Sequence, residues 1–471
     1  MSEIESSTPH EIPAQAGTPP TKRDSFTSKL GVIAATLGSA VGLGNIWKFP
    51  SMTGTNGGAA FIIIYLICTL LVSVPVMITE LMLGRTARAN AITTYQRLSP
   101  KKSQPWWLIG ASGVLAAFLI LAFYTEVAGW VFAYVTKAIG GNILSTDPEA
   151  TSAVFGKLIT SPGESLMWQW IVLAWISLII ILGVSKGIER MTKRLMPALF
   201  VILVIVCVRS LTLPGAIDGV EFLFKPDFSR ITPGVFLAAM GLAFFKLSVG
   251  MGTMTTYGSY YGDDQDIPGS ALKVMLSDLS VSILAGLAIF PAVFAFGFKP
   301  DSGPSLLFIT LPAVFASMPF GQFFMILFSI LAAIAATGAM LSLMEVPVSY
   351  LAERTKLNRT QATILTFVLL AAFGATAALS NSLLADVKIA GKTFFDLYDF
   401  ISSSLLLPIG GFFLAVFAGW VWGYPKVRDS LSNHGVLKNE KAIKAYYQIV
   451  RYVAPVLILL VLLNGLGLIK W

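Results

Sequence analysis

The chain has 471 residues, of which 55% are hydrophobic and 12% charged, and its mean hydropathy is +0.75. A soluble core could not bury so large an apolar fraction, so the composition excludes a soluble globular protein and predicts an all-α polytopic membrane protein. The net charge of +8 does not indicate nucleic-acid binding, because the lysines and arginines stand in short loops between apolar runs. Two cysteines and two histidines are too few for a disulfide framework or a metal cluster.

The N-terminal segment is polar and rich in proline, serine and threonine, which predicts a disordered cytoplasmic tail over residues 1–24 without a cleavable signal peptide. Beyond it, apolar runs of about the length that a bilayer requires recur along the chain. The eleven predicted spans cover residues 31–55, 59–85, 107–138, 167–184, 192–212, 233–262, 269–298, 319–352, 360–380, 394–422 and 446–468.

Glycines interrupt the first predicted span at Gly38, Gly42 and Gly44, just before Asn45. Glycine allows the backbone to leave the helical conformation, and unwound backbone at membrane depth is tolerated only where it is buried in protein or lines a cavity. The freed amides could hold a carboxylate and the freed carbonyls a cation, which predicts a binding site. A glycine-rich face for helix packing is the alternative interpretation.

Basic residues follow every second span, which predicts a cytoplasmic N-terminus and an extracellular C-terminus. The loop after the sixth span is the exception, because it is acidic at Asp263, Asp264 and Asp266. Loops on the other side are longer, and those over 140–166 and 302–319 are long enough to form a lid. We therefore expect a multi-pass protein of the cell membrane, and the compact tails favour a bacterial inner membrane.

A second interruption falls in the sixth span, around Ser248, Gly250 and Gly252, and its position mirrors the first. Interrupted segments that open two successive groups of five spans indicate an inverted repeat whose site lies between the broken helices. The predicted organisation is a transporter core over 25–422, made of repeats 25–212 and 231–422. A cytoplasmic loop and the eleventh helix follow over 423–471.

The residues around both interruptions resemble those of the neurotransmitter:sodium symporter family, in particular its bacterial amino-acid transporters. The resemblance extends from about Lys22 to the last helix, and it rests on the segment from Gly38 to Pro50, the glycines after Asn56, Glu80 in Thr-Glu-Leu-Met-Leu-Gly-Arg, Tyr124, and the segments 248–260 and 396–399. It implies a LeuT-like five-plus-five inverted repeat of eleven transmembrane helices, with discontinuous first and sixth helices and a substrate bound midway across the membrane.

The resemblance also implies a small-molecule amino acid as substrate. Its carboxylate would contact the amides of Leu43 and Gly44 and the hydroxyl of Tyr124. Its ammonium would be received by the hydroxyl of Ser248 and by the carbonyls of Ala40, Phe245 and Lys246. The pocket for its side chain would be apolar, which favours neutral hydrophobic amino acids, and would be formed by Ile120, Phe123, Phe245, Met251, Ala339 and Leu343. For any single apolar residue, ordinary helix packing is the alternative.

Two gates are implied by the same resemblance. Lys48 and Asp399 resemble the charged pair that closes the outer path. The inner gate would consist of Arg23 and Glu353 with Phe26, Ser259 and Tyr260. Charges at the edge of a vestibule can pair when the path closes and hydrate when it opens, whereas a charge that merely extends to the membrane surface is the alternative.

The first sodium site departs from the family pattern. Ala40 and Asn45 would be ligands, but Lys246 stands where the family has a hydroxyl, and Asp278 where it has an amide. A protonated lysine cannot ligate a cation, and it brings the charge that the ion would have brought. A lone charge at mid-membrane costs roughly 2.5–3.5 kcal/mol on insertion scales, so we expect Lys246 and Asp278 to pair. Our hypothesis is that the Lys246 ammonium replaces the first sodium ion; a fixed structural bridge is the alternative.

The second sodium site would keep the carbonyls of Gly38, Val41 and Ala335 but has Gly338 and Ala339 where the family has two hydroxyl residues. A hard cation such as sodium needs about six oxygen ligands, so this set is poor. We therefore expect sodium coupling to be weakened or absent, with proton coupling through Lys246 or Asp278, or exchange of amino acids, in its place. Ordinary sodium symport is the alternative mechanism, and no chloride requirement is expected.

Two other classes of function compete with transport. An enzyme would need a convergent nucleophile, base or metal cluster, which the scattered carboxylates and scarce histidines do not supply, so we expect no enzymatic activity and no cofactor. A non-transporting amino-acid sensor would signal through the N-terminal tail, which has no domain of its own. The expected partners are the amino acid and the lipid bilayer, with no nucleic acid, and the chain is expected to be a monomer or a homodimer.

Overall fold

The computed structural model describes residues 25–300 and 306–469, and within these ranges the chain is helical with no β-sheet. Nine helices are long and apolar enough to cross a membrane, or ten when one bent pair is counted as a single span. These are Ala59–Ala87 (containing α3, Ala59–Cys68, and α4, Val74–Ala87), Trp107–Ile139 (α6), Pro162–Ile181 (α8), Val184–Leu211 (ending in α9), Ile267–Ala295 (α13), Gly321–Arg354 (α15), Arg359–Asn381 (beginning with α16, Arg359–Ala378), Phe394–Trp422 (containing α17, Phe394–Asp399, and α18, Leu407–Val416), Glu440–Gly465 (containing α20, Glu440–Gln448, and α21, Ala454–Gly465), and the bent pair Lys29–Ala40 and Gly44–Thr55.

The sixth predicted span is the one that length alone does not identify. It corresponds to α11 (Pro233–Lys246) followed by α12 (Thr253–Gly258), and α11 has only 14 residues. The predicted helical membrane architecture is confirmed, and the predicted number of eleven spans is approached by the nine or ten that qualify by length.

Both predicted interruptions are present. The first helix ends as α1 (Lys29–Ala40) and resumes at Gly44 as a wider turn that leads into α2 (Phe49–Thr55), with a bend of 50° between the two parts. In the second break the backbone takes φ angles of 52° at Ser248, 80° at Gly250 and 73° at Gly252. Glycine adopts this left-handed region without a steric penalty, which explains how the sequence ends α11 there.

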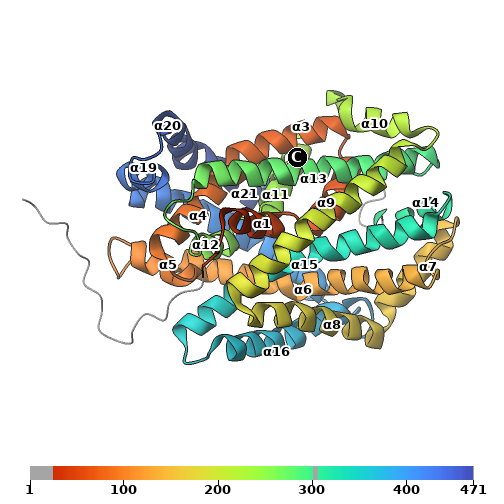
Figure 1. The fold of residues 1–471 in the computed structure, drawn as a ribbon, viewed down its shortest axis with the longest axis horizontal. Helices are drawn as coiled ribbons and strands as arrows, with labels where there is room; N and C mark the ends of the chain where they lie inside the picture. Colours follow the sequence, from red (N-terminus) through yellow and green to blue (C-terminus); the bar gives the residue numbers. More distant parts are fainter. Residues whose placement is uncertain (1–24, 301–305, 470–471) are drawn as a thin grey trace, which may run out of the picture.

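The long helices α6 and α15 run side by side, and α9 packs along α13 (Figure 1). The broken helices lie between these supports, where α1 contacts α12 and α11 contacts the first turn after the break in α1. The short helices α5 (Ala91–Leu98) and α19 (Tyr424–Leu431) lie at one end of the molecule, and α7 (Pro148–Thr160), α10 (Ala216–Phe224) and α14 (Thr310–Ala316) lie at the other (Figure 1). This arrangement brings both breaks to the middle of the bundle.

The segments expected to be long loops contain helices of their own. The segment 140–166 holds α7, which begins after Asp147 because the Asp147 side chain accepts a hydrogen bond from the Glu149 amide. It also holds the start of α8, five residues before the predicted boundary at 167, because Ser161 caps the helix and Pro162 occupies its first position. The segment 302–319 holds α14, and its residues 302–305 lie outside the described ranges.

Candidate functional site

A small cavity lies where the two breaks meet α6 and α15. Ten of the twelve predicted substrate residues line it, and Ser39 and Gly42 complete the lining; the ten are Ala40, Gly44, Ile120, Tyr124, Phe245, Lys246, Ser248, Met251, Ala339 and Leu343. Its volume is about 30 Å³, which is room for a water molecule or two but not for an amino acid. A larger ligand would enter only after the surrounding helices move apart.

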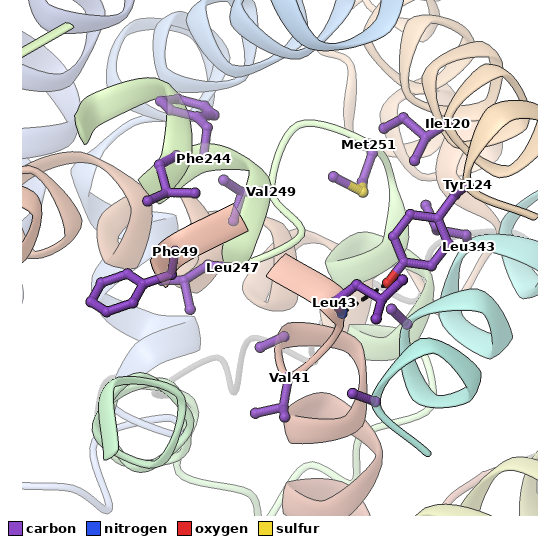
Figure 2. Close-up of a cluster of buried hydrophobic side chains, with 14 of the residues drawn as sticks. Val41, Leu43, Phe49, Ile120, Tyr124, Phe244, Leu247, Val249, Met251 and Leu343 are labelled. Atoms are coloured by element: carbon purple, nitrogen blue, oxygen red, sulfur yellow. Dashed lines mark hydrogen bonds between the residues drawn. The ribbon is translucent and has the colours of Figure 1, made fainter. Parts of the chain in front are cut away.

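Side-chain hydroxyls tie the two breaks to each other and to α6. The Leu43 amide donates a hydrogen bond to the Tyr124 hydroxyl over 2.9 Å, and the Ser248 hydroxyl donates to the Ser39 carbonyl over 2.8 Å. Figure 2 shows Tyr124, Ile120, Met251 and Leu343 gathered on one side of the Leu43 amide. The hydroxyls and the unwound backbone therefore form a polar end of the cavity, and the apolar side chains form the other.

Two predicted substrate residues do not line the cavity. The Leu43 side chain is buried with the hydrophobic core, and its amide is engaged by Tyr124. Phe123 packs edge-to-face on Phe395, with ring centroids 5.3 Å apart. Phe123 therefore does not line the small cavity in this conformation, and its part in a pocket for the substrate side chain stays a prediction.

Lys246 and Asp278 form the ion pair that the sequence predicts. Their side chains are 0% and 1% exposed, and the Lys246 Nζ lies 2.9 Å from Asp278 Oδ2. The same ammonium donates to the Tyr65 hydroxyl over 3.0 Å and to the Ser282 hydroxyl over 2.5 Å. It also lies 4.7 Å above the Phe49 ring. A buried charge needs such a set of partners, and three oxygens together with an aromatic face satisfy all the donors of this ammonium.

Asn45, predicted as an ion ligand, belongs to the same network. Its Nδ2 donates to Asp278 Oδ1 over 2.6 Å and to the Asp278 carbonyl and the Ser282 hydroxyl over 3.1 Å each, while its Oδ1 accepts from the Gly42 amide. The three acceptors around Nδ2 fix the orientation of this amide. The side-chain oxygens of Asn45 and Asp278 are thus engaged by donors of the protein itself.

The second predicted ion site is occupied by direct contact between helices. A Cβ atom on Gly338 would stand 2.6 Å from the Gly38 carbonyl oxygen, so α15 rests against α1 at the point where the family has a hydroxyl side chain. The neighbouring Thr337 hydroxyl donates to the Ala333 carbonyl of its own helix over 2.8 Å. The other donors predicted for this site are the carbonyls of Gly38, Val41 and Ala335.

Glu80, noted in the sequence only as part of a motif, holds the second break. Its carboxyl group is buried and accepts from the amides of Gly250 and Thr255 over 2.6 and 3.2 Å. These amides stand on either side of the start of α12 and have no partner within that helix. Glu80 thus stabilises the unwound segment that carries Ser248 and Met251.

Of the residues predicted for the inner gate, Phe26 and Tyr260 are in direct contact. Phe26 packs edge-on against Tyr257 and Tyr260, and the Tyr260 hydroxyl donates to Glu345 over 2.7 Å. The predicted Ser259 hydroxyl donates to the Thr256 carbonyl. Glu353 accepts from the amide and the side chain of Asn90 over 3.0 and 2.8 Å, and its predicted partner Arg23 lies outside the described residues.

The outer pair is not formed in this structure. The Lys48 ammonium lies 4.2 Å above the Phe245 ring, and Asp399 accepts from the Ser403 hydroxyl over 2.8 Å. No ion pair within 4.0 Å joins Lys48 to Asp399, both of which belong to the described ranges. In this conformation the lysine covers the cavity residue Phe245, and the pairing of Lys48 with Asp399 in a closed outer path stays a prediction.

Three groups at the site and the inner gate were not identified from the sequence. Tyr65 and Ser282 complete the shell around Lys246, although a buried tyrosine or serine in an apolar run carries no signal of its own. Arg359 donates two hydrogen bonds to the carboxylate of Glu345, over 3.0 and 2.6 Å. Glu345 stands in the middle of an apolar run, so the cost of burying its charge could have identified it as one half of a pair.

Comparisons with known proteins identify the family of the chain. A model described as the sodium:neurotransmitter symporter family matches residues 23–148 and 149–470. The chain is 38% identical over 446 residues to the uncharacterized sodium-dependent transporter YhdH of Bacillus subtilis (strain 168), covering 95% of this chain and 98% of that protein. It is 33% identical over 454 residues to an uncharacterized sodium-dependent transporter of Haemophilus influenzae, covering 94% and 98%. The crystal structure of MhsT in complex with L-phenylalanine matches with a TM-score of 0.86 and 42% identity, over 94% of this chain and 100% of that one.

Proposed function

The chain belongs to the sodium:neurotransmitter symporter family and is therefore a membrane transporter rather than an enzyme, and we propose that it carries hydrophobic neutral amino acids with the Lys246 ammonium in place of the first sodium ion. The transporter would be a monomer or a homodimer of the cell membrane with its N-terminus in the cytoplasm. The single observation that carries the proposal is the wholly buried pair of Lys246 and Asp278 beside the cavity.

The chemistry of the cavity supports an amino-acid substrate. One end offers the Tyr124 and Ser248 hydroxyls and the unwound backbone, which suit a carboxylate and an ammonium. The other end offers only apolar side chains, among them Ile120, Met251 and Leu343, which suit a hydrophobic side chain. The relative MhsT was crystallised with L-phenylalanine, an amino acid of this class.

Electrostatics support the replacement of the ion. An ammonium with no exposed surface needs a nearby anion, and Asp278 supplies it at 2.9 Å. A sodium ion added next to the same carboxylate would meet the like charge of Lys246 and would have to displace the hydrogen bonds of Asn45. The Lys246 ammonium would thus supply the positive charge that a bound sodium ion supplies elsewhere in the family. Unlike the ion, it is part of the protein and does not have to bind from solution.

The second sodium site has too few ligands to bind sodium well, so the energy for transport would come from something other than a sodium gradient. With Gly338 against α1, the residues predicted for this site offer an ion only the carbonyl oxygens of Gly38, Val41 and Ala335, which is a poor set for a hard cation. Coupling by protons through Lys246 or Asp278, or exchange of one amino acid for another, then drives accumulation. Sodium symport is the rival mechanism, and it is favoured by the names of the relatives, which describe sodium-dependent transporters.

The deciding experiment is uptake of labelled neutral amino acids into liposomes that contain the purified protein. Sodium outside is replaced by choline, with and without an inward proton gradient, and with unlabelled amino acid inside as a separate condition. The variants are Lys246→Thr, which restores the hydroxyl of the family, and Lys273→Thr, a matched change of an exposed lysine on α13.

We expect uptake by the wild type and by Lys273→Thr to survive the removal of sodium and to respond to the proton gradient or to internal amino acid. Lys246→Thr should lose this independence and should require sodium, because Asp278 then has no resident cation. Strict dependence on sodium in the wild type would overturn the replacement of the ion while leaving amino-acid transport intact. Absence of uptake of any neutral amino acid would overturn the substrate class.

A further inference from the structure

A basic pocket at the start of α9 (Arg190–Leu211) lies outside the transport site. Its volume is about 300 Å³, and it is lined by Thr27, Ser185, Lys186, Glu189, Arg190, Lys193 and Arg194. Four of these seven residues are cationic and one is anionic. We refer to this set of residues as the basic pocket.

The single carboxylate of the basic pocket is already engaged. Glu189 is buried and accepts from the amide and hydroxyl of Thr27 over 2.7 and 2.8 Å, from the Ser28 hydroxyl over 3.1 Å, and from Lys193 over 2.5 Å. Lys186, Arg190 and Arg194 are exposed, and none of the three has an ion-pair partner in the part of the chain that the structure describes. The pocket therefore retains an excess of about three positive charges, which attracts an anion.

Spacing places the unpaired cations on one side of the helix. Lys186, Arg190 and Arg194 follow each other at intervals of four residues, so each repels the next across one helical turn. A phosphate group between them would remove this repulsion, and the arginine guanidinium groups could bind it through two hydrogen bonds each.

The same side of α9 continues as an apolar stripe. Beyond Arg190 and Arg194, residues at helical spacing remain exposed, and these are Pro197, Val201, Val204 and Val208. The three valines are 59%, 46% and 56% exposed, although this helix is apolar enough to lie in a membrane. An anion held by the arginines would thus have hydrocarbon-facing surface directly below it, which is the geometry of a lipid headgroup and not that of a free ion.

We propose that the basic pocket binds the phosphate of an anionic phospholipid whose acyl chain lies along Pro197, Val201, Val204 and Val208. Thr27 forms part of the pocket and lies two residues before α1, so the pocket in this form exists only while the start of α1 is docked on Glu189. A ligand that binds one state preferentially shifts the equilibrium toward that state. The bound lipid thus stabilises the closed inner end. This inference does not depend on the substrate or on the role of Lys246.

The test measures thermal unfolding of the full-length protein in detergent during titration with a short-chain phosphatidylglycerol. Short-chain phosphatidylcholine and inorganic phosphate are titrated separately. The variants are Arg190→Gln/Arg194→Gln, the charge-preserving Arg190→Lys/Arg194→Lys, and Lys101→Gln/Lys102→Gln, which removes two exposed charges outside the basic pocket.

We expect phosphatidylglycerol to raise the unfolding midpoint of the wild type saturably by a few degrees, because a ligand that binds only the folded state stabilises it. The shift should persist in Lys101→Gln/Lys102→Gln and in part in Arg190→Lys/Arg194→Lys, and should vanish in Arg190→Gln/Arg194→Gln. Equal shifts with phosphatidylcholine, or an equal shift with inorganic phosphate alone, would overturn a site for an anionic lipid.

A further experiment tests whether acidic residues of the N-terminal tail, instead of a lipid, bind in the basic pocket. Deletion of residues 1–20 removes three glutamates. The lipid effect should be present both with and without this segment. If it appears only after the deletion, the tail and not a lipid is the natural occupant, and the proposal is wrong.

Discussion

At the scale of single residues, the Lys246 and Asp278 side chains depend on each other more than on anything else in the site. Each is buried, and each would become an uncompensated charge or an unpaired polar group if its partner were removed. The Tyr65 and Ser282 hydroxyls are neutral and cannot replace the missing charge. The pair should therefore behave as one unit in its contribution to stability.

A double-mutant cycle tests this dependence. Lys246→Met and Asp278→Asn should each lower the free energy of unfolding by about 3–5 kcal/mol, since each leaves half of a buried pair. The combination should be less destabilising than the sum of the two changes, because no charge remains buried. Unfolding midpoints of the four proteins in detergent give the comparison. Additive effects would mean that the two side chains act separately and that the contact between them is not energetically important.

At the scale of elements, the contact between α1 and α15 determines the shape of the cavity. Ala40 and Gly42 reach the cavity from the break in the first helix, and Ala339 reaches it from α15. A Cβ atom on Gly42 would stand 2.9 Å from the Ala339 Cβ atom, and one on Gly338 would stand 2.6 Å from the Gly38 carbonyl oxygen. The two helices can approach this closely only because glycine occupies both positions.

Gly338→Ala should force α1 away from α15. The nearest atom to the added methyl group belongs to the backbone and cannot rotate aside, so we expect a loss of about 1–3 kcal/mol of stability, as for an overpacked core. Affinity for hydrophobic amino acids should fall as well. Gly241→Ala on α11 is the control, because a methyl group there meets nothing within 4 Å. Equal unfolding midpoints and equal binding for the two variants would disprove the role of this contact.

At the scale of the whole molecule, Arg359 connects elements that come from both halves of the chain. It binds Glu345 of α15 with two nitrogens, and its Nε donates to the Ile180 carbonyl of α8 over 2.7 Å. Glu345 in turn accepts from Tyr260, just beyond α12. Release of this cluster would free the end of the bundle at which Phe26 covers Tyr257 and Tyr260.

Arg359→Gln should therefore open the inner end more often. The rate at which a thiol reagent modifies Ser259→Cys, in a background of Cys68→Ala and Cys207→Ala, reports this opening because Ser259 is buried. We expect the rate to rise several-fold, since Glu345 loses its cation. Arg354→Gln removes an exposed arginine near the same end and should leave the rate unchanged. If both variants react at the rate of the parent protein, the Arg359 cluster does not hold the inner end closed.

The sequence by itself determined the membrane class, both helix breaks and the pairing of Lys246 with Asp278. These features follow from local or chemical constraints. A span needs about 20 apolar residues, and glycine allows the backbone to adopt non-helical conformations without a steric penalty. Opposite charges within a bilayer pair with each other because an unpaired charge there is costly. The breaks at residues 41–43 and 247–252 and the ion pair are present as predicted.

Only the tertiary structure decided which side chains complete the site. Tyr65 and Ser282 reach Lys246, Asn45 turns its amide to Asp278, and Phe123 packs on Phe395 instead of lining the cavity. Neutral side chains in apolar runs are compatible with many packings, so their sequence positions do not specify their partners. Gly338 approaches Gly38, and Lys48 stays apart from Asp399. Both features depend on how helices that are distant in the sequence pack against each other, and a local sequence pattern does not specify that packing.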